Sequence, residues 1–335
     1  MGRSRRLLAS LALMAAVAGG CIGGSTPSAA GTALTVGLGF IPSVQFAPFY
    51  LADSAGYYRD AGLAVSFQNK VDPDLITLVG QGTVDIGLAD GTSVIPAVAN
   101  GIPIRYVATV YGRFPSIVFA KESSGIRTAA DLEGRTLGIP GRYGSSWIML
   151  QALLGSAGLG PDDIQITEYP DFTQGVAVRQ DAVEAATGFA NNEPVQLDVA
   201  GEAVTVLRVD DVVALPGPGL IAGVAALDGP KHGAIGAFVA ATLRAMDAIA
   251  ADPDVGLDAA IAAVPELGQD RELQRAILEA TIETWQGDVT AERGLGAIDR
   301  DGWAASVELL QELRIVADDV PVDQLVREDL LPARS

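Results

Sequence analysis

The chain has 335 residues, with 41 acidic against 22 basic side chains and a formal net charge of −19. This balance repels nucleic-acid backbones and anionic membrane surfaces, which disfavours both as partners. A single cysteine excludes a disulfide within the chain, and a single histidine makes zinc sites and histidine-based catalysis improbable. The length suffices for two domains of ordinary size.

The first residues resemble an export signal. Three arginines precede a twelve-residue apolar segment, 7–18, with Ser10 as its one polar residue, and two glycines then lead to Cys21. This order predicts a lipoprotein signal peptide over 1–20, lipidation of Cys21 and a flexible tether over 21–33. Ala18 stands where such signals prefer Leu or Val, so an ordinary cleaved signal stays open. A membrane-spanning anchor is disfavoured, because about 20 apolar residues are needed to cross a bilayer.

From residue 34, short apolar strands alternate with helices. Strands are expected over 34–40, 64–68, 84–88 and 104–111, and helices over 45–55, 73–79 and 92–100. This alternation predicts right-handed βαβ units on a largely parallel sheet.

The rhythm restarts near residue 112. Strands are expected over 117–120, 136–139, 164–168 and 182–189, a helix over 145–156, an extended segment over 217–227, and helices over 233–250, 271–285 and 303–313. The last three helices have no sheet of their own, so we expect them to pack on the first lobe. The prediction is an α/β protein whose first lobe is 34–116 plus 216–335 and whose second lobe is 117–215. Crossings near 112–117 and 213–220 would be the hinges.

Four ordered segments resemble one family. They are FIPSVQFAPFY at 40–50, LVGQGTVDIG at 78–87, DLEGRTLGI at 131–139 and FANNEP at 189–194. Together they resemble the ABC-importer binding proteins that take sulfonates, taurine, nitrate and thiamine-pyrimidine precursors. The last segment is similar to that of the pyrimidine-precursor branch.

The resemblance implies a two-lobed periplasmic-binding-protein fold of type II, without catalytic residues, cofactor or metal. It also implies a monomer that delivers a small-molecule ligand to an ABC permease and its ATPase outside the cytoplasmic membrane. Membrane attachment would be through the lipid anchor only. The fold family includes a pyrimidine synthase, but the chain lacks that enzyme's cysteine cluster. A sensory lipoprotein stays open, because it would use the same closure.

Ligands of parallel α/β sheets bind beyond the carboxyl ends of the strands. Phe40, Gln45 and Phe46 follow the first strand, where they could stack on and hydrogen-bond an aromatic ring, although Phe46 could equally be a core residue. Asp90 follows the third strand and is equally well explained as a helix cap. Tyr111 could line the cleft at the first crossing.

The second lobe offers Gly144 and Ser145 at a turn, and Asn192 and Glu193 after a strand. Glu193 would accept hydrogen bonds from an amino-substituted ring and repel sulfonate or nitrate, unless it is only a helix-start acid. Arg113 is the one arginine considered for an anion, with a salt-bridged hinge residue as the alternative. We therefore expect a heteroaromatic nutrient, a thiamine-pyrimidine precursor or a flavin such as riboflavin, with sulfonate, taurine or nitrate as the alternative.

Overall fold

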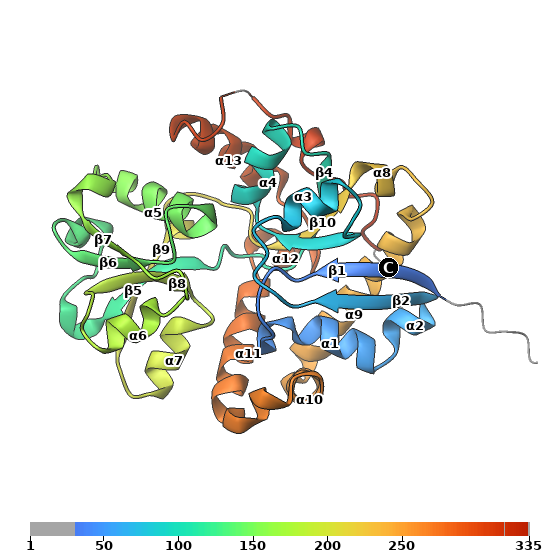
Figure 1. Ribbon diagram of the computed structural model, residues 1–335, viewed down its shortest axis with the longest axis horizontal. Coiled ribbons are helices and arrows are strands. Elements are labelled where there is room, and N and C mark those ends of the chain that lie inside the picture. Colours follow the sequence, from blue (N-terminus) through green and yellow to red (C-terminus); the bar gives the residue numbers. More distant parts are fainter. Residues whose placement is uncertain (1–30, 318, 334–335) are drawn as a thin grey trace, which may run out of the picture. The chain divides into compact units, whose positions relative to one another are not determined.

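The computed structural model describes residues 31–317 and 319–333 (Figure 1). Cys21 and the predicted signal peptide lie outside the described residues, and so does most of the predicted tether.

The first sheet has five strands. Their order is β2 (Leu63–Gln68), β1 (Thr32–Gly37), β3 (Ile86–Ala89), β10 (Gly219–Gly223) and β4 (Ile104–Thr109). β1 pairs in parallel with β2 and β3, whereas β10 runs antiparallel to β3 and β4.

The second sheet repeats this arrangement. Its order is β7 (Gln165–Glu168), β6 (Thr136–Ile139), β8 (Ala185–Phe189), β5 (Ser116–Lys121) and β9 (Val204–Arg208). β6 pairs in parallel with β7 and β8, and β5 runs antiparallel to β8 and β9.

The expectation of largely parallel sheets is confirmed for most strands and wrong for β5 and β10. Each is the first strand after a change of sheet, reached without a crossover helix. It therefore starts where its neighbours end: Ser116 pairs with Phe189, and Gly219 pairs with Ala89 and Thr109. The predicted lobe boundaries at 116/117 and 215/216 stay a prediction.

The helices in the first half of the chain agree broadly with the expected ones. They are α1 (Ala47–Ser54), α2 (Tyr57–Asp60), α3 (Leu75–Gly80), α4 (Gly91–Ala99), α5 (Gly144–Ser156), α6 (Gln174–Arg179) and α7 (Glu193–Val199). The short helices α2 and α6 and strand β9 were not expected, whereas α7 begins at Glu193, where a helix start was considered. The expected extended segment 217–227 is wrong in its last third, because the chain turns into α8 (Val224–Leu227) after β10.

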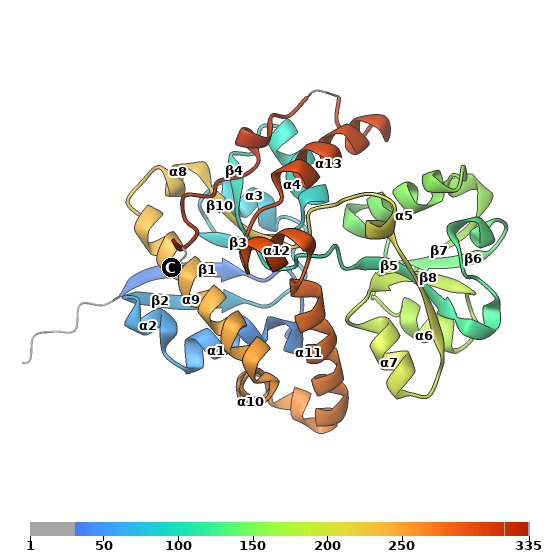
Figure 2. The ribbon, with the colours of Figure 1, turned by 180° about the vertical axis from the view of Figure 1, so that it is seen from behind.

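Five further helices complete the chain. They are α9 (His232–Ala251), α10 (Pro253–Ala263), α11 (Arg271–Trp285), α12 (Asp288–Arg293) and α13 (Arg300–Glu312). As expected, they pack on the first sheet's helices: α9 and α10 contact α1, and α13 contacts α4. Figures 1 and 2 place α1, α9 and α10 on one side of this sheet and α3, α4 and α13 on the other. α11 also contacts α7 beside the second sheet.

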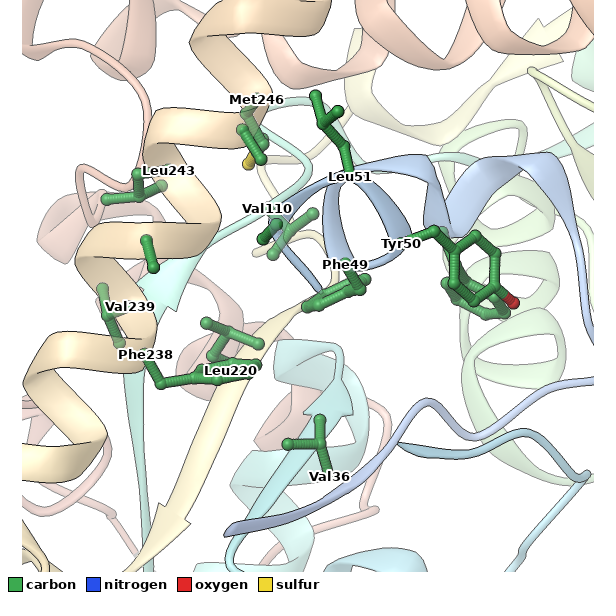
Figure 3. Packing of buried hydrophobic residues seen from close by; sticks show 14 of the residues in the cluster. Val36, Phe49, Tyr50, Leu51, Val110, Leu220, Phe238, Val239, Leu243 and Met246 are labelled. Carbon is green, nitrogen blue, oxygen red and sulfur yellow. The ribbon is translucent and has the colours of Figure 1, made fainter. Parts of the chain in front are cut away.

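Aromatic packing holds α9 against α1, as Figure 3 shows for Phe49 and Phe238, and also against α2. The Phe238 ring stacks on Tyr58 at 4.8 Å between centroids and on Phe49 at 6.3 Å. α9 is long and apolar enough by composition to cross a membrane, but 50% of its apolar window is buried inside the protein. Its packing on α1 and α10 is that of a core helix.

Candidate functional site

A cavity of about 280 Å³ lies at the carboxyl ends of strands from both sheets. We call it the cleft cavity. Its walls come from the turns after β1 and β3 in the first sheet and after β6 and β8 in the second. The volume lies just below the range of about 300–1,000 Å³ that is usual for small-molecule sites.

Eight of the predicted site residues line the cleft cavity. They are Phe40, Gln45, Phe46, Asp90, Tyr111, Ser145, Asn192 and Glu193. Gly144 begins α5 beside Ser145 but is not part of the lining. Arg113 lies elsewhere.

The two phenylalanines after β1 differ in burial. Phe46 is 5% exposed and packs on Phe49, so most of its surface belongs to the core. Phe40 is half-buried and meets Phe172, from the loop between β7 and α6, with 5.7 Å between ring centroids and 83° between ring planes. Phe40 is therefore the more accessible ring for a ligand.

Gln45 and Tyr111 form a hydrogen-bonded pair at the cavity wall. The Tyr111 hydroxyl donates to Gln45 Oε1 at 3.4 Å, and burial raises the pKa of this tyrosine. In the described part of the chain no hydrogen bond uses Gln45 Nε2, so this amide can donate to a ligand.

Asp90 is a helix cap, which is the structural role that the sequence left open for it. Its Oδ1 accepts hydrogen bonds from the Ser93 backbone N–H at 2.9 Å and the Thr92 hydroxyl at 2.5 Å, which caps α4. The cap fixes Asp90 at the cavity wall and occupies one of its oxygens.

Glu193 begins α7 and is half-buried. Its Oε2 accepts a hydrogen bond from the Phe189 backbone N–H at 2.8 Å. The carboxylate fits because position 188 is glycine: a Cβ atom there would lie 2.7 Å from Glu193 Oε2. Desolvation raises the pKa of Glu193, and no salt bridge among the described residues involves it. The free acceptor capacity of this carboxyl group is therefore open to a ligand.

The two neighbouring asparagines point to different partners. Asn192 lines the cavity and accepts a hydrogen bond from Gln196 Nε2 at 2.9 Å. Asn191, which the sequence did not single out, is buried and donates from Nδ2 to the Thr281 hydroxyl of α11 at 2.8 Å. This bond ties the end of β8 to the C-terminal helices.

Sequence reasoning also missed Phe172 and Gln174. Both line the cleft cavity, Phe172 from the loop before α6 and Gln174 from the first position of that short helix, where the sequence shows no hydrophobic periodicity. Gln174 is 2% exposed; its Nε2 donates to the Thr187 carbonyl at 3.2 Å, and its Oε1 has no hydrogen-bond partner in the described structure. A buried acceptor without a partner is costly unless a ligand or water satisfies it.

A second cavity of about 500 Å³ lies at the two crossings, and we call it the crossing cavity. Arg113 is part of its lining. Its Nε donates to Asp210 Oδ2 at 3.0 Å, so it is a salt-bridged residue of the crossing segment. Of the other predicted residues, Tyr111 lines both cavities, and the rest of those that line a cavity lie in the cleft cavity.

Segment 78–87, one of the four that carry the family resemblance, has a structural function through Asp85. This carboxylate accepts a hydrogen bond from the Thr35 backbone N–H at 2.9 Å and pairs with Lys231 Nζ at 2.5 Å. It joins β1 to the turn before β3 and to the start of α9. Within the described ranges no group of three or more His, Cys, Asp or Glu side chains is placed to hold a metal ion.

Comparisons with known proteins agree with this architecture. The family model described as "NMT1/THI5 like" matches residues 43–255. The chain is 36% identical to the riboflavin-binding protein RibY of Chloroflexus aurantiacus over 93% of both chains. It is 28% identical to the 4-amino-5-hydroxymethyl-2-methylpyrimidine phosphate synthase of Legionella pneumophila, over 54% of this chain and 57% of that one.

Among solved structures, the periplasmic aliphatic sulphonate binding protein SsuA of Escherichia coli superposes with a TM-score of 0.70 at 20% identity. The match covers 88% of this chain and 97% of SsuA. The expected two-lobed periplasmic-binding-protein fold, with its crossings and C-terminal helices, is confirmed.

Proposed function

Because the chain belongs to the NMT1/THI5-like family, we propose that it binds a small heteroaromatic solute in the cleft cavity. The observation that carries the proposal is the set of side chains in this cavity. An accessible ring, Phe40, lies with an unpaired carboxyl group, Glu193, and an open amide donor, Gln45. A flat ring with polar edges is the chemistry that these groups match.

The solute that we propose first is riboflavin or a related flavin. Its isoalloxazine ring has a uracil-like edge, with an N–H donor between two carbonyl acceptors. Glu193 would accept from the N–H, and Gln45 Nε2 would donate to a carbonyl. The relative that spans 93% of both chains is named for riboflavin binding, which supports this choice over a pyrimidine precursor.

Sulfonate, taurine and nitrate fit less well. The lining of the cleft cavity contains no Lys, Arg or His among the described residues, and Glu193 and Asp90 would repel an anion. The arginine that the sequence offered for an anion is paired with Asp210 in the crossing cavity.

The transport role is part of the same proposal. A solute that contacts both lobes favours the closed arrangement, because only that arrangement offers it both walls. We propose that a monomer, held outside the cytoplasmic membrane by a lipid at Cys21, presents the closed form to an ABC permease. A receptor kinase in place of a permease would make it a sensor. A synthase function is less well supported, because the synthase match covers 54% of the chain.

A thermal-shift screen tests the proposal. Purified protein would be heated with riboflavin, aminopyrimidines, thiamine, taurine, alkanesulfonates and nitrate, each at a large excess. A ligand at 100 times its Kd stabilises the folded protein by about 2.7 kcal/mol, which moves the melting temperature by several degrees. We expect a shift with riboflavin or an aminopyrimidine. A shift with sulfonate or nitrate alone would overturn the proposal.

A further inference from the structure

We propose that segment 172–174, which leads into α6, is a ligand-recognition element, in which Phe172 determines specificity by contacting the ring opposite Phe40. This inference rests on the proposed binding of a heteroaromatic solute. Phe172 and Phe40 both line the cleft cavity, one from the loop before α6 and the other from the turn after β1.

The backbone conformation of Phe172 is strained. Its φ is +59°, in the left-handed region that residues other than Gly, Asn and Asp rarely adopt. The residue is also 39% exposed. Glycine would form the same turn without strain, and a polar residue would suit the exposure. Strain of this kind is found mainly at functional sites, where the surrounding structure holds it.

Two other described residues besides glycines have positive φ, namely Asp181 and Arg314. Both are polar. Phe172 is the single aromatic residue of this group, and it is also the member of the group that lines the cleft cavity. Arg314 has the same backbone conformation as Phe172 but lies outside the lining of the cleft cavity. It is therefore a matched control for the effect of relieving a positive φ.

Gln174 supports the same assignment independently. It lies two residues after Phe172, at the first position of α6, is 2% exposed and belongs to the lining of the same cavity. Its acceptor, Oε1, is buried and has no partner in the described structure. One short segment therefore supplies both an aromatic surface and a buried acceptor. A ring with N–H groups on its edge satisfies both.

The geometry of the two phenylalanines favours a planar ring over a compact anion. Their planes are 83° apart, so a ring that stacks on one of them meets the other edge-on. Both arrangements are favoured by the aromatic quadrupole. The two rings are in contact at 5.7 Å between centroids. A ligand ring that binds between them must displace Phe172, and one that lies beside the pair in the cavity can contact both rings.

The test compares riboflavin affinities by titration calorimetry. We expect Phe172→Ala and Phe172→Gly to weaken binding about tenfold, and Phe172→Tyr to retain affinity, because the tyrosine ring restores the contact. Phe172→Gly should also raise the melting temperature, because glycine relieves the positive φ. Arg314→Gly should raise it similarly and leave riboflavin affinity unchanged.

The possible failures are distinguishable. If the unsubstituted protein binds no heteroaromatic ring, the proposed function and this inference both fall. If it binds riboflavin and Phe172→Ala binds equally well, only the role of Phe172 is overturned. Loss of affinity with an undiminished melting temperature excludes unfolding as the cause and supports the assignment.

Discussion

The crossing cavity and the cleft cavity differ in how their charged side chains are paired. The crossing cavity, about 500 Å³, contains Arg113 paired with Asp210. The cleft cavity, about 280 Å³, contains Glu193, which has one backbone hydrogen bond and no salt bridge among the described residues. A paired charge has little left to offer a ligand, whereas a desolvated carboxyl group without a cation gains from one. Charge pairing therefore distinguishes the two cavities better than volume does.

The largest effect that would sharpen this contrast is expected for Glu193→Gln. The amide can still accept from the Phe189 N–H, so the fold should persist, but it loses the charge offered to the ligand. A hydrogen bond to a charged group contributes about 1.5–3 kcal/mol, so riboflavin affinity should fall about 10- to 100-fold. Asp198→Asn, on the exposed side of the same helix, is the control for calorimetry. Equal affinities for Glu193→Gln and the unsubstituted protein would contradict the assigned role.

The next largest effect is expected at Gly188, because the Glu193 carboxyl group packs directly against this glycine. In Gly188→Ala the new Cβ would lie 2.7 Å from Glu193 Oε2 and 2.8 Å from Phe119 Cε1. Overpacking of this kind costs about 1–3 kcal/mol, and the displaced carboxyl group should also bind riboflavin less tightly. Gly155→Ala, in α5, has no atom within 4 Å of its Cβ and should be neutral or stabilising. Urea unfolding that gives the two variants the same stability would show that Gly188 is not needed for this fit.

Arg113→Gln would break the pair in the crossing cavity. Asp210, with a side chain 13% exposed, would lose its closest cation, while Arg113 itself is 41% exposed and partly screened. We expect a loss of about 1 kcal/mol in unfolding free energy and no change in riboflavin affinity. Arg127→Gln, at an exposed pair with Glu122, should change stability by less than about 0.5 kcal/mol. A large loss of affinity in Arg113→Gln would remove the distinction between the cavities.

The smallest effect is the dependence of stability on pH. Burial raises the pKa of Glu193 in the folded protein above its unfolded value of about 4.3. The folded state then binds the Glu193 proton more tightly than the unfolded state does. The resulting contribution to the free energy of unfolding is fully present below the unfolded pKa and is lost as pH rises through the folded pKa. Without ligand, the unsubstituted protein should lose stability relative to Glu193→Gln over that interval. If urea unfolding gives the two proteins the same dependence of unfolding free energy on pH, Glu193 is solvated in the folded state and this prediction is wrong.

Much of the fold could be predicted from the sequence, because the strands are short apolar runs and the helices between them are long enough to show periodicity. α11, expected over 271–285, has those bounds. The direction of β5 and β10 could not be predicted, since it depends on which sheet a strand joins.

The site was predictable only in part. Residues at strand ends, such as Gln45 and Glu193, could be placed because topology brings strand ends together. Phe172 lies in a loop without periodicity, and Gln174 begins the short helix that follows it. The role of Gly188 could not be predicted, because it depends on how close the Glu193 side chain lies to position 188. For Arg113 the salt-bridged alternative is the correct one, but the sequence does not identify its partner, Asp210, 97 positions later.

The position of β10 between β3 and β4 has a consequence for synthesis of the chain. The one strand that pairs with β4 in the described structure is β10, which follows the whole second sheet. More than a hundred further residues must therefore be synthesised before β4 can pair with β10. The strands β5 to β9, by contrast, all lie in one continuous stretch of the chain. We expect the second sheet to be completed first during translation. The first sheet is completed only when β10 has left the exit tunnel and pairs with β3 and β4.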